Sequence, residues 1–331
     1  MSFKDIKGQD KTIAILKEYL RQSRVASAYL FAGPEATGKK LIAGIFAKAL
    51  NCRENIFDSC DTCPSCLKMD KSGHPDLHFI GGPADNNTDK TDAIKIEDIR
   101  QLQKDINLKP YEAKIKVFII DNAHRLTPEA SNALLKILEE PPMHSLIILI
   151  THKPALLFKT IISRCQVLKF YPLTRNKLKE ILKTDYSLND NQAHFLAYFS
   201  EGRLGYALML KEKDILKDKN RIIDGFLSHK NIALGNSLEK NRHELRAYLN
   251  IMAVWFRDIY LIKAGYPGSE IINSDRENEL LASTDKYSFN DLDEIFKSIS
   301  NTVLYLEENL NIKLLLSNLS CLFKTHSTDK D

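Results

Sequence analysis

Residues 27–50, SAYLFAGPEATGKKLIAGIFAKAL, join a short apolar run to a glycine-containing turn and then to a helical pattern. The turn at 33–40 follows the phosphate-loop pattern G-x-x-x-x-G-K-[ST] except at its last position, where Lys40 replaces the hydroxyl residue. In such a loop, backbone N–H groups and the helix N-terminus face the phosphates, and Lys39 would reach the β and γ phosphates. The stretch predicts a phosphate-binding turn, the alternative being an ordinary βα turn with surface lysines. The residues that fit the pattern are Gly33, Gly38 and Lys39.

Short apolar runs recur through the first half of the chain, at 76–80, 116–121, 145–151 and 165–170. Near-continuous apolar runs of this length suit parallel strands that are buried on both faces. Helical patterns separate them, at 39–50, 96–106 and 128–140, and Thr127 followed by Pro128 supplies an N-cap and a first-turn proline for the last of these helices. The alternation predicts an α/β fold in which helices cover both faces of a parallel sheet.

The strand signal stops after residue 174, and the remaining sequence has helical periodicity. Its apolar residues recur at steps of three and four, which is typical of packed helices. The most loop-like stretch of this part is 265–278. We predict three domains: an α/β domain over 1–170, a small helical domain over 171–212 and a helical domain over 213–331.

The amino-acid composition indicates the general class of protein but does not identify its binding partners. The chain has 331 residues and a net charge of +4, which permits contact with nucleic acid without requiring it. No apolar run approaches the roughly 20 residues needed to cross a bilayer, and MSFKDIKGQD at 1–10 has no apolar signal core. We expect a cytoplasmic protein without a membrane partner.

The second half of a nucleoside-triphosphatase site should be an apolar strand that ends in Asp and is followed by a water-activating Glu. VFIIDNAH at 117–124 supplies the strand and Asp121, but Asn122 stands where the Glu belongs. An amide cannot act as a general base, and Lys40 cannot coordinate Mg²⁺ as a hydroxyl would. The site is therefore expected to hold phosphate at best and to hydrolyse it poorly.

Four cysteines lie within the segment 52–66, in a chain whose N-terminus does not suggest export. Four thiolates suffice for a closed tetrahedral Zn²⁺ site, which stabilises a loop and performs no chemistry. The alternatives are a chance cluster of reduced cysteines and an iron–sulfur cluster. Cys165 and Cys321 lie within apolar patterns and are expected to be small core residues. The expected zinc ligands are Cys52, Cys60, Cys63 and Cys66.

The cysteine insertion after the phosphate-loop helix, followed by a degenerate Asp strand, resembles the clamp-loader ATPases of bacterial DNA polymerase III, which are AAA+ proteins. Four other stretches carry the same resemblance. They are FKDIKGQDK at 3–11, ASNALLKILEEPP at 130–142, ITHKPALLFKTIISRC at 150–165 and EENLNIKLLLSNL at 307–319. The resemblance implies that the two helical domains are the lid and the oligomerising collar of this family.

The same resemblance assigns roles to individual residues. Thr151 falls on the family's sensor strand, and the family's Ser-Arg-Cys motif falls on 163–165. The motor subunits, gamma and tau, carry an arginine in the lid where this chain has Gly205, with Arg203 out of register. The resemblance implies a subunit with weak or absent ATP binding that supplies Arg164 in trans as an arginine finger. The alternative for Arg164 is a structural salt bridge.

The implied partners are the gamma or tau and delta subunits, the sliding clamp and primer–template DNA. Arg100 and Lys104 are candidates for facing the DNA phosphates. One alternative is an ATP-hydrolysing motor subunit. Another is a DNA-binding module with a zinc ribbon, which the scarcity of basic and aromatic residues in the cysteine segment disfavours. A small-molecule phosphate-loop kinase is not suggested by the Ser-Arg-Cys motif or the helical second half.

Overall fold

The computed structural model describes residues 1–55, 57–71, 73–81, 93–228 and 242–307. The chain divides into two compact units, Met1–Thr174 with Arg203–Tyr206, and Arg175–Gly202 with Ala207–Asp331. The division into three domains stays a prediction.

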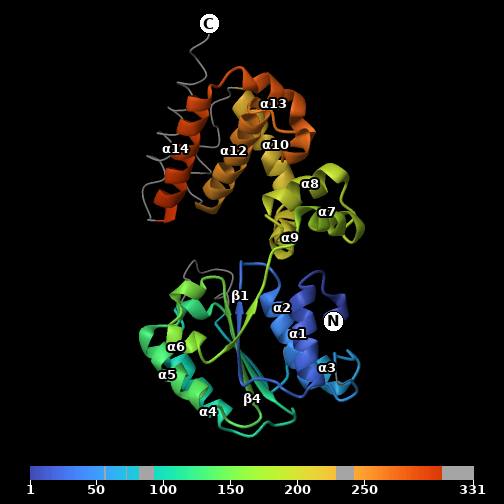
Figure 1. Ribbon diagram of the computed structural model, residues 1–331, viewed down its shortest axis with the longest axis vertical. Helices are drawn as coiled ribbons and strands as arrows, with labels where there is room; N and C mark the ends of the chain where they lie inside the picture. Colours follow the sequence, from blue (N-terminus) through green and yellow to red (C-terminus); the bar gives the residue numbers. More distant parts are fainter. Residues whose placement is uncertain (56, 72, 82–92, 229–241, 308–331) are drawn as a thin grey trace. The chain divides into compact units, whose positions relative to one another are not determined.

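The first unit is built on a five-stranded parallel sheet (Figure 1). The strand order is β2-β3-β4-β1-β5. Every apolar run that predicted a strand forms one. The strands are β1 (Ala28–Ala32), β2 (Leu77–Ile80), β3 (Lys116–Ile120), β4 (Ser145–Thr151) and β5 (Gln166–Lys169).

Helices cover both faces of this sheet. On one side lie α1 (Asp10–Arg21), α2 (Lys39–Leu50) and α3 (Pro64–Asp70); on the other lie α4 (Ile96–Ile106), α5 (Pro128–Glu139) and α6 (Lys159–Ile162) (Figure 1). Successive strand residues point to opposite faces, so Tyr29 and Phe31 join the core under α1 and α2, whereas Ala28 and Leu30 join the core under α4 and α5. The predicted α/β fold with helices on both faces is confirmed.

The local chemistry that predicted α5 is also present in the structure. Thr127 caps the helix, its side-chain oxygen accepting a hydrogen bond from the Ala130 N–H at 3.2 Å, and Pro128 occupies the first turn. These two features set the start of the helix at the carboxyl-end edge of the sheet.

The second unit is helical wherever it is regular. Among the described residues, no helix is both long and apolar enough to cross a bilayer. Of the predicted stretch 307–319, only Glu307 lies within the described residues, and Cys321 lies outside them. The helices are α7 (Arg175–Thr184), α8 (Asp190–Phe199), α9 (Leu204–Glu212), α10 (Ile215–Leu227), α12 (Arg242–Lys263), α13 (Glu277–Thr284) and α14 (Phe289–Glu307). Short 3₁₀ helices add η4 (Gly268–Glu270) and η5 (Ser274–Arg276) to this unit; the first unit contains η1 (Phe3–Asp5), η2 (Ala123–Arg125) and η3 (Pro154–Leu156).

The predicted loop-like stretch 265–278 contains the 3₁₀ helices η4 and η5 and the first two residues of α13, and part of it is buried. Asp258 on α12 is fully buried and accepts hydrogen bonds from the Ile272 N–H at 3.1 Å and the Asn273 N–H at 2.7 Å. The Asn273 side-chain amide donates a third bond at 2.8 Å. A buried carboxylate therefore anchors this loop, which polarity along the sequence did not reveal.

Candidate functional site

The phosphate loop connects β1 to α2 and needs glycine at two positions. A Cβ on Gly33 would lie 2.3 Å from the Phe170 carbonyl oxygen, so no larger residue fits there. Gly38 has φ of +88°, in the left-handed region that favours glycine. The Gly33 N–H donates to the Thr151 carbonyl at 3.2 Å, which joins the loop to the end of β4. The predicted strand–turn–helix context is present.

Lys39 is only 7% exposed and turns back onto its own loop. Its ammonium donates to the Gly33 carbonyl at 2.7 Å and to the Pro34 carbonyl. Burial lowers the pKa of Lys39 to about 8, although the nearby carboxylates of Glu35 and Asp121 oppose the change. Two of its three N–H donors are therefore already used by the loop.

Lys40 supplies a positive charge beside the carboxylate that would hold a metal. Its Nζ lies 3.3 Å from Asp121 Oδ2 and 5.6 Å from the centroid of the Phe79 ring. The side chain of Asp121 is 16% exposed, so its charge is partly shielded from water. The substitution at Lys40 thus removes a hydroxyl ligand and also neutralises the second half of the site.

Asn122 adopts a left-handed backbone conformation with φ of 55° and ψ of 45°. Its N–H donates to Asp121 Oδ1 at 3.0 Å, so the two oxygens of Asp121 have different partners. Asn tolerates this conformation better than most residues. The position is occupied by an amide that cannot take a proton from water.

These residues border a cavity of about 450 Å³ at the carboxyl-end edge of the sheet. Residues 203–206 cluster with the first unit, which places Gly205 among the lining residues. Gly33 and Thr151 were predicted at the site but do not line the cavity. The lining residues are Glu35, Ala36, Gly38, Lys39, Lys40, Leu41, Asp121, Asn122, Ile150, His152 and Gly205.

Sequence reasoning missed a pair of histidines at this edge. His152 Nε2 lies 3.1 Å from Glu35 Oε1, and His124 Nδ1 lies 3.2 Å from Thr151 Oγ1. The two imidazole rings meet nearly edge to face, with centroids 4.3 Å apart. Burial, followed by the proximity of His152, lowers the pKa of His124 to about 4, so His124 is neutral at pH 7. Each histidine lies close to a strand's carboxyl end, and that position was the signal available in the sequence.

The four predicted zinc ligands come together. The sulfur atoms of Cys52, Cys60, Cys63 and Cys66 all lie within 4.8 Å of one another, and those of Cys60 and Cys66 are 3.9 Å apart. A zinc ion with Zn–S bonds of about 2.3 Å needs sulfur separations of about 3.8 Å. Backbone N–H groups of Asn55 and Cys63 donate to the sulfurs of Cys52 and Cys60, each at 3.3 Å, which suits thiolate ligands. The residues fit a structural zinc ion.

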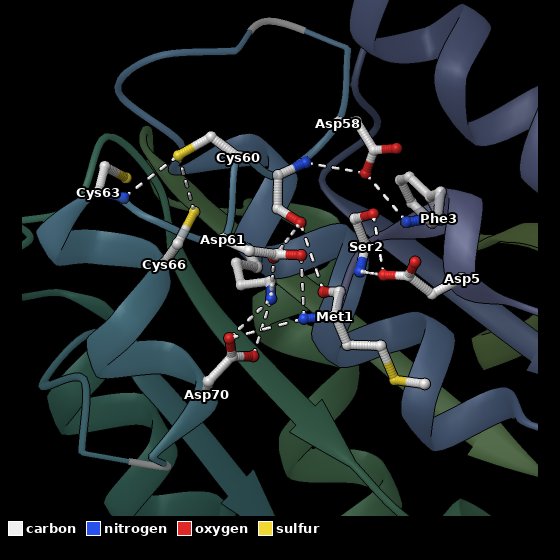
Figure 2. Close-up of polar contacts among 12 residues, drawn as sticks. Met1, Ser2, Phe3, Asp5, Asp58, Cys60, Asp61, Cys63, Cys66 and Asp70 are labelled. Atoms are coloured by element: carbon white, nitrogen blue, oxygen red, sulfur yellow. Dashed lines mark hydrogen bonds and ion pairs between the residues drawn. The ribbon is translucent and has the colours of Figure 1, made fainter.

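A buried lysine ties the cysteine segment to the phosphate-loop helix, and the two carboxylates that it contacts, Asp61 and Asp70, are shown in Figure 2. The side chain of Lys48 on α2 is 2% exposed and donates to Asp61 Oδ1 at 2.6 Å and Asp70 Oδ1 at 2.8 Å. Burial opposes its charge, but these hydrogen bonds outweigh burial and raise the pKa of Lys48. The Phe3 N–H adds a bond to Asp58 Oδ1 at 3.0 Å. The segment is thus fastened to α2 and to the N-terminal turn.

Arg164 follows α6, and the structure places its side chain in an ion pair. Its Nη2 lies 2.7 Å from Glu139 Oε1, and its Nη1 donates to the Thr160 carbonyl at 3.0 Å. The side chain keeps 34% of its surface exposed. Neighbouring Cys165, which was expected in the core, is only partly buried and packs against the core under α4 and α5, and burial raises the pKa of its thiol to about 12.

Arg100 and Lys104 are both exposed on α4. They are four residues apart on the helix, so they lie on the same face. This placement is compatible with phosphate contacts, and their role in binding DNA stays a prediction.

Comparison with known proteins identifies the family. The model described as "DNA polymerase III, delta subunit" matches residues 8–174, and the model described as "DNA polymerase III, delta subunit, C terminal" matches residues 214–324. The chain is 33% identical over 297 residues to DNA polymerase III subunit tau of Bacillus subtilis, which covers 81% of this chain and 51% of that protein. It is 34% identical over 191 residues to DNA polymerase III subunit delta' of the same bacterium, which covers 57% and 55%.

The chain thus spans about half the length of these two relatives. Among solved structures, a DNA polymerase III gamma subunit-related protein from Thermotoga maritima aligns with 97% of this chain and 100% of its own, at 19% identity and a TM-score of 0.48. The two family models match different parts of the chain, and the first alone covers half of it. The chain therefore belongs to the DNA polymerase III delta-subunit family.

Proposed function

We propose that this chain is a delta-prime-type clamp-loader subunit, which does not hydrolyse ATP and supplies Arg164 in trans to a neighbouring motor subunit. The observation that carries this proposal is the ion pair of 3.3 Å between Lys40 and Asp121. It places an ammonium beside the carboxylate that a motor subunit needs for Mg²⁺.

Hydrolysis needs a metal ion to neutralise charge on the phosphates and a group to orient the attacking water. In this chain a magnesium ion would have to displace the Lys40 ammonium from Asp121, against the repulsion of two positive charges. Asn122 offers no carboxylate to activate water, and Gly205 offers no guanidinium. Three separate features thus act against turnover at this site.

Arg164 is the group that remains for catalysis in a complex. An arginine donated in trans to a phosphoryl-transfer site raises the rate by about 10³–10⁵. Leu156 and Phe158, close to Arg164 in the chain, are 62% and 40% exposed, which suits a face that packs against another protein.

The remaining parts of the proposal concern the assembly. The partners would be the gamma or tau and delta subunits, the sliding clamp and primer–template DNA, in the cytoplasm. The helices of the second unit would form the collar, Zn²⁺ would stabilise the cysteine segment, and Arg100 and Lys104 would face the DNA.

A gamma- or tau-type motor subunit is the second candidate. It is favoured by the retained Gly33, Gly38 and Lys39 and by the cavity of about 450 Å³ beside them. A motor should hydrolyse ATP by itself and lose this activity on Lys39→Ala.

The test is to assay the purified chain alone and after reconstitution with motor and delta subunits. We expect no Mg²⁺-dependent ATPase above background for the isolated chain, and DNA-stimulated ATPase and clamp loading for the complex. Turnover by the isolated chain that is abolished by Lys39→Ala would establish the motor type instead.

A further inference from the structure

The guanidinium of Arg164 is held by two groups of its own chain. Nη2 donates to the Glu139 carboxylate at 2.7 Å, and Nη1 donates to the Thr160 carbonyl at 3.0 Å. Glu139 is the last residue of α5 and Thr160 lies on α6, so the contact ties the side chain to both helices. Both terminal nitrogens of the arginine are engaged.

An arginine binds phosphate and carboxylate groups with the same donors. The planar guanidinium can offer two parallel N–H bonds to one anion, and its two terminal nitrogens form one such pair of donors. A phosphate that takes both terminal nitrogens of Arg164 must therefore compete with Glu139 for the nitrogen Nη2. The Glu139 carboxylate of the same chain therefore occupies a donor that, in the proposed function, binds a phosphate held by the neighbouring subunit.

We propose that Glu139 is a positioning residue that holds Arg164 back from the neighbouring subunit's nucleotide until the γ-phosphate displaces it. This inference rests on the proposed function, in which Arg164 acts in trans. The ligand that completes the exchange is the triphosphate of a nucleotide bound by the adjacent motor subunit.

The ion pair between Arg164 and Glu139 is weak enough for the arginine to be released. The side chains of Arg164 and Glu139 are 34% and 52% exposed, and an ion pair this accessible to water stabilises its geometry only weakly. A triphosphate carries more negative charge than one carboxylate, so it wins the competition when present. In its absence the carboxylate keeps the guanidinium folded against α5 and α6.

The experiment uses the complex reconstituted with motor and delta subunits, carrying Glu139→Gln in this chain. Glutamine keeps the shape and removes the charge. We expect the ATP concentration for half-maximal hydrolysis to fall by about two- to fivefold, the range set by an exposed ion pair. The maximal rate should stay within about twofold of wild type, because Glu139 does not take part in the transition state.

Glu140→Gln is the matched control, since it removes the same charge one residue away and should leave both constants unchanged. Arg164→Ala tests the proposed function itself, and Glu139→Gln added to it should have no further effect. Thermal melts of each isolated variant check folding.

The possible outcomes distinguish the role of Arg164 in trans from the holding role of Glu139. If Arg164→Ala hydrolyses ATP like wild type, the trans role fails and the holding role fails with it. If Arg164→Ala is impaired but Glu139→Gln matches Glu140→Gln, only the holding role is overturned. A lower maximal rate for Glu139→Gln would also overturn it, because Glu139 would then orient the arginine for catalysis.

Discussion

At the scale of single residues, the lysine at position 40 changes the phosphate-loop site in two ways. It removes the hydroxyl that ligates Mg²⁺, and it places an ammonium 3.3 Å from Asp121 Oδ2. The first effect follows from residue type alone. The second depends on α2 and β3 meeting at the same edge of the sheet.

Lys40→Thr should therefore strengthen binding of ATP with Mg²⁺ by about tenfold, equivalent to about 1.4 kcal/mol, because it frees Asp121 and restores a metal ligand. It should not produce turnover, since Asn122 still lacks a carboxylate. Isothermal titration with and without Mg²⁺, together with an ATPase assay, measures both results. Lys40→Met removes the charge without adding the hydroxyl, so it separates the two effects. Rapid hydrolysis by Lys40→Thr would show that Asn122 is not limiting.

At the scale of elements, the cysteine segment is held by groups close to it in the chain, whereas the 107–115 loop is held by a residue more than 30 positions away. The segment is closed by four thiols and fastened by Lys48. The loop is held by Asp76, which is 1% exposed and accepts N–H bonds of 2.8 to 2.9 Å from Tyr111, Glu112 and Ala113.

The zinc prediction is one ion per chain, bound by four thiolates. Cys63→Ser should lower the zinc content and loosen residues 52–66, while the main sheet keeps its protection from hydrogen exchange, because the segment packs on α2 and does not enter the sheet. Elemental analysis of reduced protein and hydrogen exchange measure these outcomes. Cys165→Ser is the control that should retain the metal. Reduced wild-type protein free of zinc would contradict the assignment.

The Asp76 contact predicts a loss of stability in acid. Burial opposes the charged form, but the three N–H bonds outweigh burial and lower the pKa of Asp76 below the ordinary value of an aspartate. A group with a lowered folded pKa stabilises the fold fully above its unfolded pKa, about 3.9, and the contribution is lost as the pH falls through the folded value. Asp76→Asn should cost about 1–3 kcal/mol at pH 7 and much less near pH 2. Urea unfolding at both values measures this, and an equal cost at both would contradict it.

At the scale of the whole molecule, the arginines and the lysine that the proposed function assigns to partners are accessible to solvent. Arg164 and the α4 cations Arg100 and Lys104 are exposed, and the helices of the second unit form a body of their own. Under the proposed function, in which the chain does not hydrolyse ATP by itself, it would act through such surfaces.

Arg164→Ala should therefore matter only in the complex. Folding and assembly should be unaffected, because an exposed arginine contributes little to stability. The neighbouring motor site should lose about 10³-fold or more in rate, and the ATPase of the whole complex should fall by less because other sites remain active. Arg164→Lys should rescue poorly, since lysine keeps the charge without the planar fork. Steady-state and single-turnover assays of the reconstituted complex measure these effects, and a wild-type rate would return Arg164 to a structural role.

The sheet strands and the helices at 39–50 and 96–106 could be read from the sequence because their signals are local. Apolar runs, helical periodicity and the cap formed by Thr127 each involve neighbouring residues. The four thiols and the phosphate loop were visible for the same reason: their residues lie close together in the chain. The family resemblance added Arg164, which no local pattern singles out.

The α/β fold, the helical second half and the clustering of four cysteines could thus be read from the sequence, as could the missing hydroxyl at position 40 and the missing carboxylate at position 122. Only the tertiary structure decided what the charged residues do. It paired Lys40 with Asp121, Arg164 with Glu139, Lys48 with Asp61 and Asp70, and Asp258 with the backbone of 272–273. Most of these partners lie on different elements, and a charge's partner depends on how elements pack, which periodicity along one segment does not encode.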